Sequence, residues 1–115
     1  MSPTEELAAL RLSYARSLPD RLRLVREALG AWAEAPGDTE SYARAESLAH
    51  RLRGTTGSYG FGAFSEKLGA VEDALRHFRA AGAPPHEAMA AVEKDLGAAD
   101  GLAAEVIAGL EAGSA

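Results

Sequence analysis

The sequence predicts an all-α protein, an antiparallel four-helix bundle with an additional short helix at its N-terminus. The 115 residues are rich in alanine, leucine, arginine and glutamate, which are strong helix formers, and 47% of them are hydrophobic. Apolar residues recur at spacings of three and four along five segments, and no segment shows the alternation of a strand. Because a chain of this length builds one core, we expect a single domain over residues 1–115.

Proline marks the start of each of the first two helices. Ser2-Pro3-Thr4-Glu5 fits a capping box, and the first helix is expected to run to about Leu18. Its apolar residues at helical spacing are Leu7, Leu10, Tyr14 and Leu18. Pro19-Asp20 can open the second helix, which Ala35-Pro36-Gly37 ends. The predicted buried stripe of that helix is Leu22, Val25, Leu29 and Trp32.

A third helix is expected to begin after Asp38 or Thr39, either of which can cap it. Its apolar side carries Ala45, Leu48, Leu52 and Tyr59. The C-terminal end of this segment carries few side chains, because it has glycines at positions 54, 57, 60 and 62. The sequence leaves open whether the helix continues through these glycines or ends at Gly54 in a flexible loop.

The last two helices carry the most regular apolar patterns. The fourth has a seam of Phe64, Leu68, Val71, Leu75 and Phe78, at the alternating spacing of bundle helices. After a turn at residues 81–85, the fifth continues the pattern through Met89, Val92, Leu96, Ala99, Ala103, Val106 and Leu110. This helix is expected to be able to bend near Gly97 or Gly101, and the tail Gly113-Ser114-Ala115 is expected to fray.

Composition excludes several classes of function. The chain has no cysteine, so neither a disulfide framework nor a thiolate metal site can form, and its histidines lack the tight spacing of metal ligands. A net charge of −5 argues against binding to nucleic acid. No apolar run approaches the length of a membrane span, and the acidic first residues do not resemble a secretory signal. We therefore expect a soluble, cytoplasmic monomer whose partner is a protein.

His50 is the candidate functional residue. On a helical wheel it points away from Leu48 and Leu52, and so towards solvent. Ala43, Gly54 and Gly57 lie within about 40° of it on that wheel, so the surface around the ring has few side chains. Each glycine inside a helix costs about 1 kcal/mol relative to alanine, which is understandable if a partner must approach the backbone closely.

Two features refine this interpretation of His50. Arg53 lies one turn after it and can offer a guanidinium group to an anion held on the ring. The other two histidines, His77 and His86, have no such setting and are expected to be ordinary surface residues.

The segment from Leu48 to Gly60 resembles the signature of the histidine-containing phosphotransfer (HPt) family. That signature has a histidine, any residue, a hydrophobic residue, Lys or Arg, glycine, and a second glycine six positions later. The chain matches it at His50, Leu52, Arg53, Gly54 and Gly60. Residues 57–61 are also similar to the phosphorylated first domain of chemotaxis-type histidine kinases. The departure is arginine at position 53, where lysine is commoner; the charge is kept, but the side chain is bulkier and forked.

The resemblance implies a phosphoryl carrier without kinase activity of its own. His50 would take a phosphoryl group from an aspartyl phosphate of a response-regulator receiver domain and pass it to another receiver. A sensor or hybrid histidine kinase is the other expected partner. Magnesium is expected on the receiver only, so the chain itself needs no cofactor. The expected docking surface consists of Ala43, Arg51, Gly54 and Gly57.

Glu72 completes the candidate site. The seam of the fourth helix leaves it at the flank of the apolar stripe, from where its carboxylate could reach the His50 ring if the third and fourth helices pack antiparallel. A hydrogen bond to one ring nitrogen would fix the tautomer and activate the other nitrogen. The similar chemotaxis-kinase domains carry a glutamate at the matching position. The alternative is an exposed glutamate paired with Arg76, four residues later.

Two other functions remain open at this point. The chain can be a separate substrate domain that a chemotaxis-like histidine kinase phosphorylates directly, since nearly the same residues are needed. It can also be a structural adaptor bundle with no phosphotransfer, in which the bare patch serves only for docking.

Overall fold

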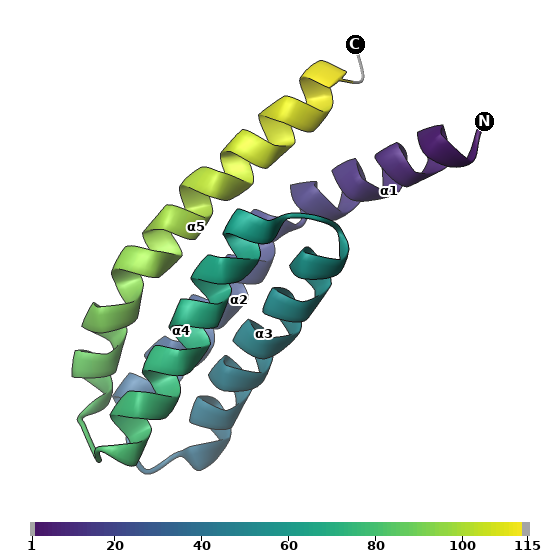
Figure 1. Cartoon of the computed structure of the whole chain (residues 1–115). Coiled ribbons are helices and arrows are strands. Elements are labelled where there is room, and N and C mark those ends of the chain that lie inside the picture. The colour runs from purple at the N-terminus through teal and green to yellow at the C-terminus, as the bar shows by residue number, and fades with distance from the viewer. Residues whose placement is uncertain (1, 114–115) are drawn as a thin grey trace.

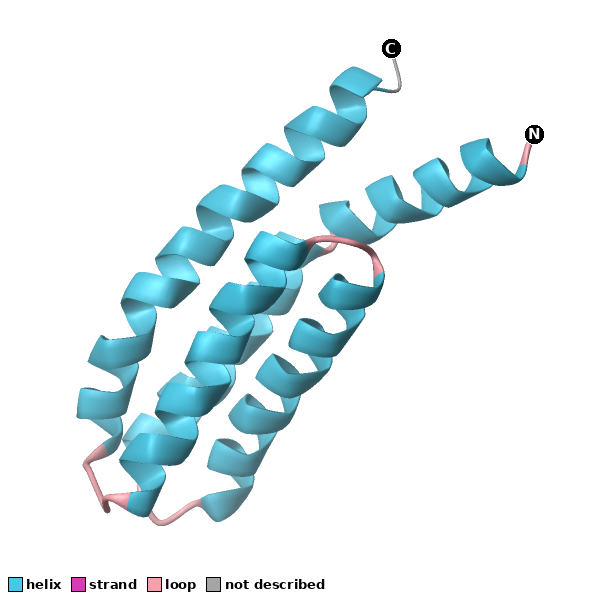
Figure 2. Cartoon of the chain, in the orientation of Figure 1, coloured by secondary structure: helices cyan, strands magenta, loops and turns pink. Residues whose placement is uncertain are grey.

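The computed structural model describes residues 2–113, which form five helices joined by short turns and contain no strand (Figures 1 and 2). The helices are α1 (Pro3–Arg16), α2 (Leu18–Glu34), α3 (Thr39–Ser58), α4 (Gly62–Ala80) and α5 (Pro85–Gly113). The predicted fold class is confirmed. Gly113 is the last residue of α5. Ser114 and Ala115, the rest of the expected frayed tail, lie outside the described residues.

Helices α2 to α5 form the four-helix bundle. α3 packs between α2 and α4, and α5 closes the bundle by packing against α4 and α2. α1 is joined to α2 through Ser17 alone and packs mainly against α5. Figure 1 shows that α1 and the C-terminal half of α5 extend beyond the turn between α3 and α4. The extra helix therefore lies at one end of the bundle.

Local sequence signals set the helix boundaries. Ser2 Oγ accepts a hydrogen bond from the Glu5 amide at 3.2 Å, as in a capping box. Asp38, and not Thr39, caps α3 by accepting from the amides of Glu40 and Ser41, and hydrogen bonds from Ser41 lower the pKa of Asp38. Gly60 adopts a φ of 83° in the turn after α3, a conformation that favours glycine.

The core contains most of the predicted apolar positions. The stripes of α2 and α4 are buried, except that Phe78 is half-buried. In α5, Val92, Leu96, Ala99 and Ala103 are buried, while Met89, Val106 and Leu110 pack at the edge of the core. α5 is a continuous helix through Gly97 and Gly101. The buried positions of α3 are Tyr42, Ala45, Ala49, Leu52 and Thr56, with Leu48 half-buried beside them.

The structure differs from expectation mainly at α1. This helix ends at Arg16, and Leu18 belongs to α2. Leu7 and Leu10 are 55% and 58% exposed, because the start of α1 projects past the bundle. Tyr14 is half-buried and stacks on Tyr59, with 4.5 Å between ring centroids. The helical spacing was present, but at Leu7 and Leu10 no neighbouring element buries that face.

Candidate functional site

His50 projects from the middle of α3 into solvent, with 68% of its side chain exposed. The helix continues for eight residues beyond it to Ser58, so the alternative of a loop starting at Gly54 is wrong. Gly54 and Gly57 are consequently helical residues. An imidazole on a regular helix, held away from the apolar core, is open to a reactant from solvent.

The Glu72 side chain reaches this imidazole from α4. Its Oε2 lies 2.7 Å from His50 Nδ1, so the predicted contact is present. Unlike the ring, the carboxylate is buried, with 1% of its side chain exposed. An ionised carboxylate only accepts hydrogen bonds, so in a neutral ring this contact favours the tautomer with the proton on Nδ1 and the lone pair on Nε2. The contact thus engages Nδ1, while most of the His50 side chain remains exposed.

Two guanidinium groups also donate to Glu72. Arg53 contacts Oε1 through NH1 at 3.0 Å, and Arg76 contacts Oε2 through NH2 at 3.0 Å. A buried carboxylate without partners would be strongly destabilising, so these donors compensate its charge. The alternative pairing of Glu72 with Arg76 therefore exists together with the contact to His50. Arg53 is 47% exposed, and its remaining N–H groups can still serve an anion on the ring.

Gly69 of α4 makes room for Arg53, a role that the sequence did not suggest. A Cβ atom at this buried position would lie 3.1 Å from Arg53 Nε, closer than ordinary van der Waals contact. A side chain at position 69 would therefore require Arg53 to shift by a few tenths of an ångström from its present path to Glu72. The available signal was a glycine three residues before Glu72 inside a regular helix, where glycine has a cost.

The predicted docking positions Ala43, Arg51, Gly54 and Gly57 are all exposed. A Cβ at Gly54 would have no heavy atom within 4 Å, so the helix surface one turn from His50 is open. Gly57 is different, because a Cβ there would meet Ser65 Oγ at 3.4 Å. It lies towards α4, next to the Ser65 hydroxyl that donates to the Arg53 carbonyl at 2.8 Å. The open patch is therefore centred on His50 and Gly54.

If the chain exchanges a phosphoryl group with a receiver, as the resemblance implies, replacing Gly54 by Gln is expected to slow that exchange about tenfold, equivalent to about 1.4 kcal/mol, because the side chain obstructs close approach. The free energy of unfolding should rise by about 0.5 kcal/mol, since glycine is a poor helix former. Stopped-flow transfer assays and thermal melts measure both. Gly97→Gln, at an open and exposed position of α5, is the matched control. Equal rates for Gly54→Gln and the parent protein would remove the close-approach argument.

The surroundings of His50 contain a shallow hollow of about 260 Å³ on its α4 side, lined by Ala43, Glu46, Ser47, Arg76 and Arg79. His77 and His86 are exposed elsewhere. Within residues 2–113, no three His, Asp or Glu side chains cluster in a way that would hold a metal ion. No helix in this range is long and apolar enough to span a membrane.

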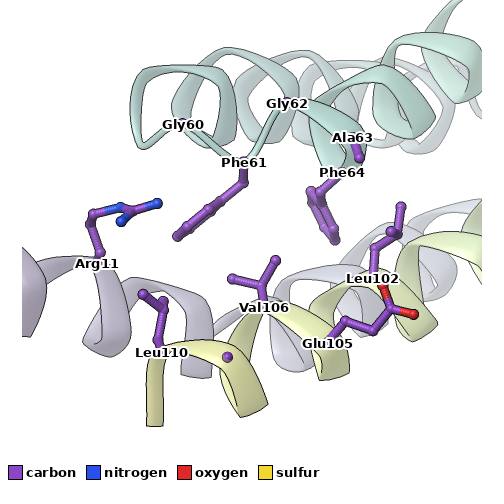
Figure 3. Close-up of a pocket in the computed structure, with 11 residues that line it drawn as sticks. Arg11, Gly60, Phe61, Gly62, Ala63, Phe64, Leu102, Glu105, Val106 and Leu110 are labelled. Carbon is purple, nitrogen blue, oxygen red and sulfur yellow. The ribbon is translucent and has the colours of Figure 1, made fainter. Parts of the chain in front are cut away.

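A second hollow, of about 350 Å³, lies between α1, the α3–α4 turn and α5 (Figure 3). Phe61, Phe64 and Val106 point into it, and Arg11 closes one side (Figure 3). The Arg11 Nε donates to the Tyr59 carbonyl at 3.0 Å, and its guanidinium lies over the Phe61 ring. This hollow shares no lining residue with the one beside His50.

Comparison with known protein families gave a match over most of the chain. A family model described as Hpt domain matches residues 9–109. Neither the curated proteins nor the solved structures gave a match to the chain. The matched range includes all of α2, α3 and α4, and with them His50, Arg53 and Glu72.

Proposed function

Because the chain belongs to the Hpt domain family, we propose that it carries a phosphoryl group on Nε2 of His50 and exchanges it with an aspartate of a receiver domain. Membership of the family implies histidine phosphotransfer in a phosphorelay, and Hpt domains are carriers that interact with receiver domains and histidine kinases. The observation that carries the assignment to His50 is its 2.7 Å contact with the buried Glu72, while the rest of the ring is exposed.

The arrangement supports a simple transfer step. The Nε2 lone pair attacks the phosphorus of the aspartyl phosphate in line with the leaving carboxylate oxygen. The N–P bond forms as the P–O bond to the aspartate breaks, and the aspartate leaves as a free carboxylate. The imidazole becomes positively charged, and its Nδ1–H donates to Glu72 throughout. Magnesium and the acidic pocket belong to the receiver.

The source of the phosphoryl group is the point to test. A receiver labelled on its aspartate should transfer label to the chain, whereas a chemotaxis-like kinase with ATP but no receiver should not. The contact between His50 and Glu72 also fits a substrate domain of such a kinase, which is the second candidate function. Rapid labelling by kinase and ATP alone would favour that candidate, and no labelling by either route would favour the adaptor. We propose that the protein is cytoplasmic, as is typical of the Hpt family.

Arg53→Ala should slow transfer by a few fold without abolishing it and should shorten the lifetime of the phosphohistidine. The guanidinium group stabilises an anion on the ring, but it is half-exposed, so water and salt screen the effect. Single-turnover transfer and the decay of label on the isolated protein measure the two quantities. Arg44→Ala removes the same charge from an exposed position of α3 and should change neither. Unchanged values in Arg53→Ala would exclude Arg53 from the site.

A further inference from the structure

Arg76 joins the site residue Glu72 to a second carboxylate, that of Glu46. Its NH2 donates to Glu72 Oε2 at 3.0 Å, and its Nε donates to Glu46 Oε1 at 2.9 Å. Glu46 lies one helical turn before His50 on α3, and Arg76 lies one turn after Glu72 on α4. The hydrogen bond between them lowers the pKa of Glu46 and raises the pKa of Arg76. Although 55% of the Arg76 side chain is exposed, its guanidinium group is bound by a carboxylate from each of the two helices.

These contacts belong to a regular series of pairs between α3 and α4. The pair of His50 and Glu72 is followed, one turn further along both helices, by Glu46 and Arg76, and then by Tyr42 and Arg79. In the last pair the guanidinium lies 4.2 Å from the Tyr42 ring centroid, and burial raises the pKa of Tyr42 to about 12. The Tyr42 hydroxyl lies near Glu46 but makes no hydrogen bond of acceptable geometry within the described residues.

The two oxygens of Glu72 have different hydrogen-bond donors. Oε2 accepts from both His50 Nδ1 and Arg76, whereas Oε1 accepts from Arg53 alone. The forked guanidinium of an arginine can bind both oxygens of one carboxylate. Without Arg76, Arg53 is free to take Oε2 as well, which draws this oxygen away from Nδ1. The ring then loses the acceptor that fixes its proton.

We propose that Arg76, anchored by Glu46, is a positioning residue that keeps Oε2 of Glu72 against Nδ1 of His50. It thereby holds the ring proton on Nδ1 and leaves the lone pair on Nε2. Its consequence for phosphotransfer rests on the function proposed above. The position of the proton is a property of the protein alone and is measured without any partner.

The test is 15N NMR of the full chain labelled on its histidines, at a pH where the His50 ring is neutral. In the parent protein, Nδ1 should resonate as a protonated nitrogen and Nε2 as an unprotonated one. In Arg76→Ala both resonances should shift towards the tautomer with the proton on Nε2. Glu46→Ala should cause a smaller shift in the same direction. Arg76→Lys should fall between Arg76→Ala and the parent protein, because a single ammonium does not reproduce the fork.

Arg44→Ala is the matched control. It removes a positive charge from an exposed position of α3 that does not line the hollow beside His50, and it should leave the His50 resonances unchanged. Circular dichroism verifies that each variant is folded. Transfer from a phosphorylated receiver should fall roughly tenfold in Arg76→Ala and stay at the parental rate in Arg44→Ala.

Parental resonances in Arg76→Ala, or an equal shift in Arg44→Ala, would overturn the proposal. If the parent protein accepts no phosphoryl group while the resonances shift as expected, the proposed function fails and the positioning role stands.

Discussion

His50→Gln is expected to accept no label from a phosphorylated receiver. Glutamine has no nitrogen lone pair that can attack phosphorus, because its amide nitrogen is delocalised into the carbonyl. In the parent protein the label should be labile in acid and stable in base, as a phosphoramidate is and a phosphate ester is not. Incubation with 32P-labelled receiver, followed by gel separation and treatment with acid or base, measures both properties.

The other two histidines serve as controls for this experiment. His77 and His86 are exposed but contact no buried carboxylate in the hydrogen bonds of the described residues. His77→Gln and His86→Gln should therefore be labelled at the parental rate. Label that persists in His50→Gln would assign the phosphoryl group to a different residue and contradict the proposed function.

Glu72→Gln is expected to slow transfer by about 10- to 100-fold while the bundle remains folded. Glu72 uses two acceptor oxygens to bind three donors, which come from His50, Arg53 and Arg76. Glutamine has only one acceptor oxygen. When the guanidinium groups occupy the amide oxygen, the amide NH2 faces Nδ1 and donates to it. The ring proton then moves to Nε2 and blocks the attacking nitrogen.

Single-turnover kinetics and 15N NMR test the effect of Glu72→Gln independently. The rate should fall, and the ring resonances should report a proton on Nε2. Glu66→Gln removes the same charge from an exposed position of α4 and should leave both unchanged. A parental transfer rate in a folded Glu72→Gln protein would show that the carboxylate only stabilises the helix packing.

Much of the fold could be predicted because local signals and apolar spacing agree. The capping residues Ser2 and Asp38 mark helix starts, and the seam of α4 is buried as expected. The spacing in α1 was misleading, since Leu7 and Leu10 repeat at helical intervals without a neighbour to cover them. Periodicity identifies the face of a helix, but tertiary arrangement decides whether that face is buried.

The candidate site could be predicted in part. The wheel placed His50 towards solvent, and the antiparallel packing of α3 and α4 brought Glu72 to its ring. The sequence did not indicate that Glu72 would be buried or that Arg53 would donate to it. It also gave no sign of Gly69 as the space for that arginine or of the link from Arg76 to Glu46. Such contacts depend on the register between two helices, which single-helix patterns do not contain.

The side chains that donate hydrogen bonds to Glu72, and Glu46, which binds one of those donors, come from one helical hairpin. Glu46, His50 and Arg53 lie on α3, Arg76 lies on α4, and residues 59–61 join the two helices. The other helices support this hairpin through the apolar core. On the outer surface, Leu24 of α2 and Arg51 of α3 line a common hollow that contains neither His50 nor Glu72. Substitutions at Leu24 should therefore alter that hollow without disturbing the hydrogen bonds of Glu72, so this surface and the candidate site can change independently.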